Sequence, residues 1–314
     1  MKCKRCRKAE AAVDLPSHHS AFCPECFFVF FRKQVVEGIR TLSLLSPEDR
    51  VLVCVSGGKD SLVLWDILME LGYRTEGLYI DLGIDGYSDR SREKVLAYAG
   101  ARGKEPVVLD LREEGIPIPE AAKRARKEEC AVCGTVKRYH FNRVAARRGF
   151  TVVATGHNLD DEAARLLGNL LHWDHDHLSR QHPLLPEAAE GLVRKVKPLW
   201  RVSEIETAAY GFLKGIDYVT EECPMSVDAT SLVYKEALSI IEEKMPGTRR
   251  HFYQGFLRQN RDVPENRDGS HGGAKEGEDE SPPGRCLSCG TPTHTETCSY
   301  CRLKDRVTKT RGRS

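Results

Sequence analysis

The chain has 314 residues, which is enough for one α/β domain of ordinary size with small additional modules. Its formal net charge is only +2, so a nucleic-acid partner would have to bind local basic patches rather than the whole surface. No signal peptide precedes the first cysteine pair, and no apolar run approaches the roughly 18 residues of a membrane span. The sequence therefore predicts a cytoplasmic protein with no membrane contact.

Ten of the twelve cysteines form five C-x2-C pairs. Disulfides are rare in cytosolic proteins, so this spacing indicates metal binding. Two pairs separated by sixteen residues open the chain, and two separated by eight residues close it, and each set predicts a tetrahedral Zn²⁺ site. The predicted zinc ligands are Cys3, Cys6, Cys23 and Cys26 in the first site, and Cys286, Cys289, Cys298 and Cys301 in the second. His18 and His19 are expected to be loop residues.

An aromatic cluster follows the first zinc site, at the start of a helix predicted for Phe27 to Leu45. Its members are Phe27, Phe28, Phe30 and Phe31. We expect them to pack the zinc module onto the next domain. The alternative is a stacking surface for nucleic acid.

A phosphate-binding loop is predicted between an apolar strand, Val51 to Val55, and a helix that begins near Ser61. Ser56, Gly57 and Gly58 permit positive φ angles and close backbone approach, while Lys59 adds a positive charge. The run Ser-Gly-Gly-Lys-Asp-Ser lacks the four-residue spacer of the G-x-x-x-x-G-K-[ST] pattern. It resembles the pyrophosphate loop (PP-loop) of enzymes that adenylate a carbonyl or amide oxygen.

Strands and helices alternate beyond this loop. Further strands are predicted at 75–81, 107–110, 151–155 and 193–198, with helices at 91–103, 205–215 and 231–244. The pattern predicts an α/β fold with a doubly wound parallel sheet, whose ligands bind beyond the carboxyl ends of the strands. The nucleotide-binding residues predicted there are Val55, Ser56, Gly57, Gly58, Lys59, Asp60, Ser61, Ile80 and Gly156.

The segment Gly156-His157-Asn158-Leu159-Asp160-Asp161 leaves the fourth strand and opens a helix. Carboxylates at a helix start often act as caps, and an Asp beside the phosphate loop can also hold Mg²⁺. We expect Asp160 to cap the helix and Asp161 to bind Mg²⁺ and the triphosphate.

The third C-x2-C pair, Cys130 and Cys133, has no neighbouring pair, and its best companion is the isolated Cys223. Three thiolates can hold a [4Fe–4S] cluster with one open iron, or act as a thiol relay through a persulfide. A zinc site completed by a histidine is the third possibility, and the candidates are His172, His175, His177 and His182.

Basic residues surround this pair and also end the chain. The central run comprises Lys123, Arg124, Arg126, Lys127, Lys137, Arg138, Arg143, Arg147 and Arg148, and the tail carries Arg302, Lys304, Arg306, Lys309, Arg311 and Arg313. We expect both to contact phosphates of a nucleic acid, although a solvated helix face would show the same composition.

Together these motifs resemble the PP-loop tRNA 2-thiolation enzymes, and among them the TtuA-type 2-thiouridine synthetases with zinc ribbons at both ends. The resemblance implies ATP-dependent adenylation of the 2-oxygen of 5-methyluridine 54 in tRNA, followed by replacement with sulfur. It implies a [4Fe–4S] cluster on Cys130, Cys133 and Cys223, catalytic roles for Asp60, Lys137 and Asp161, and nucleotide contacts from Lys137 and Asp161. It also implies a thiocarboxylated ubiquitin-like sulfur carrier and a homodimer. Glu162-Ala163 stands where related enzymes often have Glu-Thr, so Glu162 is given no role.

Four regions are predicted: an N-terminal zinc ribbon (1–27), the PP-loop catalytic domain (28–260), a polar Gly/Pro-rich linker (261–284) and a C-terminal zinc ribbon with a basic tail (285–314). The alternatives are thiolation of a wobble uridine or a cytidine, a cluster-free PP-loop ligase, and an RNA-binding zinc module without catalysis.

Overall fold

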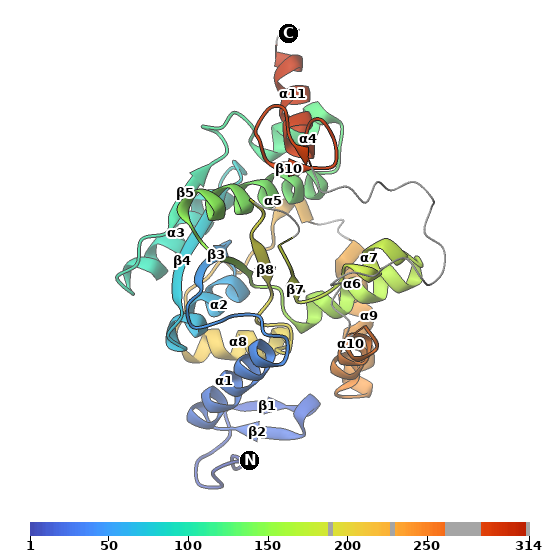
Figure 1. The fold of residues 1–314 in the computed structure, drawn as a ribbon. Helices are drawn as coiled ribbons and strands as arrows, with labels where there is room; N and C mark the ends of the chain where they lie inside the picture. Colours follow the sequence, from blue (N-terminus) through green and yellow to red (C-terminus); the bar gives the residue numbers. More distant parts are fainter. Residues whose placement is uncertain (188–190, 227–229, 261–283, 312–314) are drawn as a thin grey trace.

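The computed structural model describes residues 1–187, 191–226, 230–260 and 284–311. Its centre is a six-stranded sheet with the order β5-β4-β3-β6-β8-β7 (Figure 1). The strands are β3 (Arg50–Val55), β4 (Arg74–Asp81), β5 (Val107–Asp110), β6 (Val152–Thr155), β7 (Leu184–Leu185) and β8 (Arg194–Val196). All neighbours are parallel except β7 and β8. The predicted doubly wound parallel sheet is confirmed, with one short antiparallel strand at its edge.

Alternate residues of β3 serve two hydrophobic cores, one on each face of the sheet. Val51, Val53 and Val55 join the core formed with α1 (Pro24–Thr41), α2 (Lys59–Glu70) and α8 (Glu204–Leu213). Leu52 joins the other core, which includes buried residues of α4 (Ile118–Ala125) and α5 (Glu129–Arg148). A strand buried on both faces explains why its sequence is continuously apolar.

Gly77 on β4 makes room for the largest core side chain. A Cβ atom at this position would lie 2.6 Å from the ring of Trp65 on α2, which is fully buried. Glycine in a strand interior commonly marks such a close approach. Here it lets α2, and therefore the loop before α2, pack tightly onto the sheet.

The N-terminal module comprises β1 (Val13–Leu15), a 3₁₀ turn (Pro16–His18), β2 (Ser20–Phe22) and the start of α1. Phe27 and Phe31 are fully buried, and the Phe31 ring stacks on Tyr210 of α8 at 4.4 Å between centroids. The prediction that the aromatic cluster packs the module onto the catalytic domain is confirmed.

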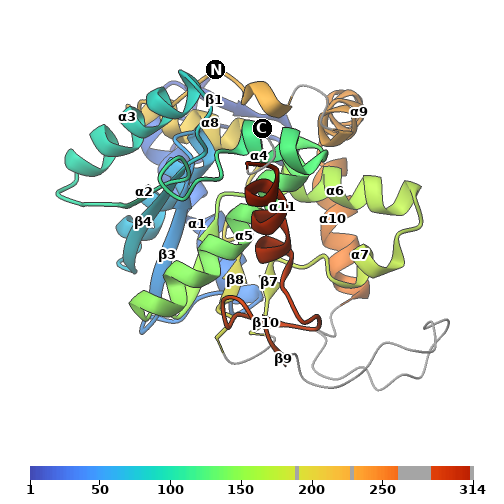
Figure 2. The ribbon, with the colours of Figure 1, turned by 90° about the horizontal axis from the view of Figure 1, so that it is seen from above.

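The C-terminal module comprises β9 (Gly284–Arg285), β10 (Pro292–Thr293) and α11 (Ser299–Arg311). It packs onto α4 and α5, at the opposite end of the molecule from the N-terminal module (Figure 1). Seen from above, α11 lies beside α5 (Figure 2). Tyr300 stacks on Tyr139 of α5 with ring centroids 3.6 Å apart and planes at 4°. The Arg124 side chain also donates a hydrogen bond to the Val307 carbonyl oxygen at 3.2 Å.

Several elements differ from the sequence-based predictions. The helix α3 spans Tyr87–Gly100 and so begins four residues before the predicted start at residue 91. The strand β7 and the helices α7 (His175–Ser179) and α10 (Thr248–Gln259) were not predicted, whereas α6 (Leu159–Leu171) and α9 (Thr230–Lys244) were. The predicted linker lies outside the described residues except for Gly284, as does Arg313 of the basic tail. None of the described helices is long and apolar enough to cross a membrane.

Candidate active site

The loop between β3 and α2 is held open by hydrogen bonds of its own serines. The Ser56 N–H donates to the Ser61 hydroxyl oxygen at 3.1 Å, and this hydroxyl donates to the Gly58 carbonyl oxygen at 2.9 Å. Gly57 has a φ of 83°, and a Cβ there would lie 2.8 Å from the carbonyl oxygen of Ser91. The loop therefore requires glycine, and it presents backbone N–H groups at the start of α2, where an anion binds well.

Gly156 brings the end of β6 against this loop. A Cβ at Gly156 would lie 2.9 Å from backbone atoms of Asp60 and Ser61. Only glycine fits this approach. The segment that follows β6 consequently runs directly beside the phosphate loop, as the sequence predicted.

Two lysines and three carboxylates form a charge network beside the loop. Lys59 lies 3.1 Å from Asp60 and 2.7 Å from Glu204, at the start of α8. Lys235 of α9 lies 2.6 Å from Asp161 and 3.4 Å from the same Glu204. Carboxylate oxygens are the ligands that Mg²⁺ prefers, so this donor set fits a magnesium ion held against phosphate groups.

The two predicted catalytic carboxylates of this network are buried in different environments. Burial raises the pKa of Asp60, although Lys59 and a hydrogen bond from the Thr207 hydroxyl oppose the shift. Burial also acts to raise the pKa of Asp161, but the Lys235 ammonium lowers it below its ordinary value. Asp161 is therefore kept ionised at neutral pH.

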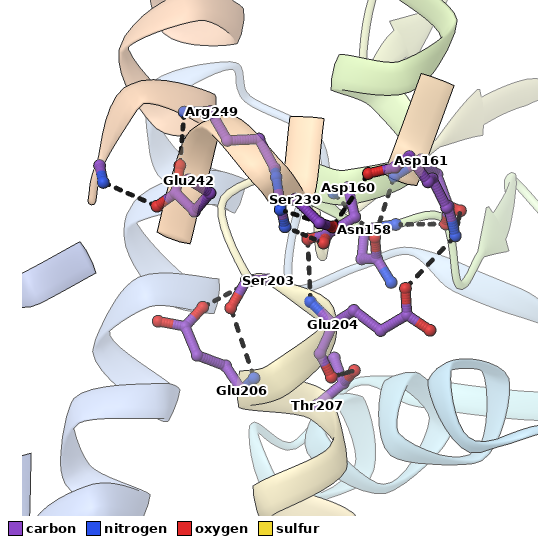
Figure 3. Close-up of polar contacts among 12 residues, drawn as sticks. Asn158, Asp160, Asp161, Ser203, Glu204, Glu206, Thr207, Ser239, Glu242 and Arg249 are labelled. Carbon is purple, nitrogen blue, oxygen red and sulfur yellow. Dashed lines mark hydrogen bonds and ion pairs between the residues drawn. The ribbon is translucent and has the colours of Figure 1, made fainter. Parts of the chain in front are cut away.

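The start of α6 corrects the capping role expected for Asp160. Asn158 caps this helix, accepting from the backbone N–H groups of Asp160 and Asp161, while an Asp161 carboxylate oxygen accepts from the Asn158 N–H at 3.0 Å (Figure 3). Asp160 instead pairs with Arg249 of α10 and accepts from the Glu204 N–H at 2.9 Å. Asn158 is the cap because it stands immediately before the first helical turn, whereas Asp160 lies within that turn.

A cavity of about 370 Å³ joins the loop to the three isolated cysteines. Its walls include the strand ends Val55 and Ile80, the loop residue Ser56, and Lys137. Cys130, Cys133 and Cys223 line the same space. Residues distant in sequence therefore meet at one cavity beyond the carboxyl ends of β3 and β4.

Local structure positions the three thiols. Cys130 and Cys133 lie on the first turns of α5, and the Cys130 thiol donates to the Met225 carbonyl oxygen at 3.3 Å. Cys223 precedes a 3₁₀ turn (Pro224–Ser226), and its carbonyl oxygen accepts from the Ser226 N–H and hydroxyl at 2.9 and 2.7 Å. The loop around Cys223 is thus fixed against the start of α5.

Lys137 lies one turn of α5 after Cys133. Its burial acts to lower its pKa, but the neighbouring Cys133 and Cys223 sulfurs raise it, so the ammonium stays charged. This places a positive charge in the wall of the cavity that Ser56 and the three cysteines also line.

The terminal cysteines have the geometry of zinc sites. The four sulfurs of each set lie within 4.8 Å of one another, and the Cys6–Cys23 and Cys289–Cys298 sulfurs are 3.9 and 3.8 Å apart. Four sulfurs about 2.3 Å from one tetrahedral ion would be separated by about 3.8 Å, which these distances match. His18 stays outside the first set and pairs instead with Glu206, at 2.6 Å.

The central trio has a different geometry. Within the described residues, Cys130, Cys133 and Cys223 do not approach one another as closely as the terminal sets, and no histidine joins them in a group of that kind. His172 lines a different cavity. The donor set fits a larger group than a single zinc ion, because cluster ligands bind three separate irons.

Sequence reasoning missed Glu204, Thr207 and Lys235, which complete the charge network. Ser203-Glu204-Ile205-Glu206 is a capping box, in which Ser203 and Glu206 bond to each other's backbone N–H groups. This signature predicts a helix start and was recognisable. Nothing in the sequence near Lys235 indicates a contact with Asp161.

Comparison with known proteins places these features in one family. Residues 2–28 match the family model described as "2-thiouridine synthetase TtuA, N-terminal LIM domain". The chain is 47% identical to a tRNA-5-methyluridine(54) 2-sulfurtransferase of Thermus thermophilus, over 98% of this chain and 92% of that protein. It is 38% identical to the protein of the same name from Thermotoga maritima, over 100% and 99% of the two chains.

A solved structure confirms the fold. The U34-tRNA thiolase NcsA from Methanococcus maripaludis, determined with its [4Fe-4S] cluster, superimposes with a TM-score of 0.77 at 23% identity. The match covers 97% of this chain and 96% of that one. The two chains therefore share their fold over nearly their whole length.

Proposed function

Because the chain belongs to the family of tRNA-5-methyluridine(54) 2-sulfurtransferases, we propose that it replaces the 2-oxygen of 5-methyluridine 54 in tRNA with sulfur, using ATP. The observation that carries this proposal is the single cavity shared by the phosphate loop, Lys137 and the three cysteines. It lets activation of the base and delivery of sulfur take place without movement of the substrate between two sites.

The first step is adenylation of the base. The uridine 2-oxygen attacks the α-phosphate of ATP, and pyrophosphate leaves toward the N–H groups of the Ser56–Ser61 loop. Lys59 compensates the charge on the departing pyrophosphate, and Lys137 compensates the charge that develops on the α-phosphate. Asp60 and Asp161 would hold Mg²⁺, which supplies charge neutralisation of the triphosphate.

The second step replaces the adenylated oxygen. Sulfide attacks C2 of the base, the C2–O bond breaks, and AMP leaves with both electrons of that bond. Cys130, Cys133 and Cys223 would hold a [4Fe–4S] cluster, which when bound supplies an open iron that keeps sulfide as an anion at neutral pH. Lys137 remains beside the AMP phosphate and stabilises it as a leaving group.

Other parts of the proposal extend beyond the catalytic cavity. The two terminal cysteine sets would each bind one Zn²⁺, which their mutual sulfur distances support. A ubiquitin-like protein with a C-terminal thiocarboxylate would donate the sulfur, and two chains would form a homodimer. The division into residues 1–27, 28–260, 261–284 and 285–314 stays a prediction.

The test is anaerobic incubation of the purified protein with ATP, sulfide and unmodified tRNA, followed by nucleoside mapping. We expect 2-thiolated 5-methyluridine at position 54, release of AMP, and a brown protein. Sulfur at another position would contradict the assigned substrate. A colourless protein with full activity would contradict the cluster.

A Lys59→Ala variant separates catalysis from simple RNA binding. We expect it to bind tRNA normally and to lose AMP formation, because it lacks the charge that holds pyrophosphate. Unchanged function would support an RNA-binding module without catalysis.

A further inference from the structure

We propose that a second cavity, between α6 and α9, binds an unpaired nucleotide of the tRNA substrate, with Trp173 at its rim as a stacking platform for the base. The inference rests on the proposed function and adds where the RNA lies. A base that is adenylated must leave its helical stack, so nucleotides near it are accessible to side chains.

The cavity has a volume of about 400 Å³ and adjoins the phosphate site. Asp161 and Lys235 belong both to its walls and to the charge network beside the loop. A nucleotide bound here would therefore lie next to the place where the base is activated. None of the three central cysteines lines this cavity, so it is separate from the sulfur-bearing one.

The two helices that form its walls pack closely against each other. A Cβ at Gly168 of α6 would lie 2.7 Å from the Tyr234 ring of α9, so only glycine admits the ring. The Tyr234 hydroxyl is 3.1 Å from Nε2 of His172 at the end of α6. These contacts fix α9 against α6 beside the cavity.

Trp173 is an exposed residue in the turn between two residues of the cavity wall. Its side chain is 71% exposed, and the residues on either side of it, His172 and Asp174, both line the cavity. Its backbone has a φ of 49°, a left-handed conformation that bulky residues rarely adopt. Hydrogen bonds from the Trp173 and Asp174 N–H groups to Leu170 and Asn169 hold this turn, at 3.1 and 2.9 Å.

The chemistry of this site suits a nucleotide. An exposed indole ring stacks on any base, and Arg165 in the cavity wall forms no ion pair with a described residue, so it is available for a phosphate. The walls carry the polar side chains of His157, Arg165, Asn169 and His172. A cavity with charged and hydrogen-bonding side chains in its wall and an exposed aromatic ring beside it fits RNA better than an apolar segment of a protein.

Tryptophan fluorescence tests the proposal directly. Trp173 is the exposed one of the three tryptophans, because Trp65 and Trp200 are 0% and 3% exposed. Acrylamide will therefore quench mainly Trp173 in the intact protein. We expect saturating unmodified tRNA to protect it. Unchanged quenching, while a mobility shift shows that tRNA is bound, would overturn the proposal. So would protection by a ubiquitin-like carrier but not by tRNA.

Substitutions give an independent readout. Trp173→Ala is expected to weaken tRNA binding about ten-fold without changing ATP affinity, and Trp173→Phe to restore most of it, because a phenyl ring still stacks. Phe212→Ala, which removes an 81% exposed aromatic ring on α8, is the matched control and should bind tRNA normally. Equal losses in Trp173→Ala and Phe212→Ala, or no loss in either, would overturn the stacking role.

Arg165→Ala should weaken tRNA binding. It should also reduce the slope of the logarithm of the binding constant against the logarithm of salt concentration by about one, the value of one phosphate contact. Lys244→Ala at the end of α9 should change neither quantity. An unchanged salt dependence would contradict the phosphate contact.

Failure of this inference is distinguishable from failure of the proposed function. If the wild-type protein thiolates tRNA while Trp173 does not respond, the inference alone is wrong; if it neither binds nor thiolates tRNA, both are wrong.

Discussion

The terminal cysteine sets and the central trio use the same C-x2-C spacing in two different environments. At each end of the chain, four sulfurs lie within 4.8 Å of one another, and backbone N–H groups lower the pKa of Cys3 and of Cys286 to about 6 against the effect of burial. In the centre, burial raises the pKa of Cys130 and Cys223, and the sulfurs line a cavity.

This difference is the one expected between a closed structural metal site and an open one. Four converging sulfurs satisfy a tetrahedral ion completely and leave no position for a substrate. Three separated sulfurs beside Lys137 and a cavity leave space for a larger group and a reacting base. The surroundings of the C-x2-C pair therefore decide its chemistry, and the spacing alone does not.

The substitution with the largest expected effect on this comparison is Cys223→Ala. We expect thiolation to fall by at least about 1,000-fold, with loss of iron and visible absorption, while the terminal zinc ions stay bound. Thiolation assays, metal analysis and a thermal melt measure this. Cys54→Ala, at a cysteine of β3 that lines the same cavity, is the control and should keep its iron. Retained iron in Cys223→Ala would show that the trio is not the cluster site.

Cys286→Ser should have the opposite effect on the two metals, with zinc lost and iron retained. It removes a predicted zinc ligand, so we expect about one zinc ion fewer per chain and loosening of the C-terminal module from α4 and α5. Limited proteolysis and metal analysis test this. Retention of both zinc ions would contradict a four-cysteine structural site, and loss of iron with intact zinc would remove the distinction between the two kinds of site.

Arg249→Met breaks the buried ion pair with Asp160 and should cost about 3–5 kcal/mol of folding stability at neutral pH. In the wild-type protein, burial raises the pKa of Asp160 to about 6 although Arg249 opposes this. Without Arg249 the pKa rises further, so the folded variant is protonated at a higher pH than the wild-type protein, and the defect should shrink as the pH falls from 8 toward 6 and level off below it. Denaturant titrations at pH 5 and 8 measure this, and an equal loss at both would contradict the assignment.

The smallest expected effect is that of Lys235→Ala on pH dependence. Lys235 opposes the effect of burial and lowers the pKa of Asp161, so its removal should raise that pKa. The acidic limb of the activity profile should then move to higher pH, with activity about ten-fold lower at neutral pH. Lys244→Ala on the same helix is the control. An unchanged profile would show that Lys235 does not tune this carboxylate.

Local motifs made the fold and much of the site predictable. The loop Ser56–Ser61, the strands β4, β5, β6 and β8, and the two terminal cysteine sets have signatures that depend only on neighbouring residues. The missing parts depend on tertiary contacts: β7 has two residues and no distinctive pattern, and Lys235 meets Asp161 only because α9 packs on α6. Asp160 was misassigned because a carboxylate at a helix start does not reveal that Arg249 is its partner.

The packing of α11 on α5 also links the C-terminal module mechanically to the central cysteines. Tyr300 of α11 stacks on Tyr139 of the helix that carries Cys130 and Cys133. A displacement of either ring would lose this contact. Movement of the C-terminal module would therefore be transmitted to Cys130 and Cys133 through a single helix.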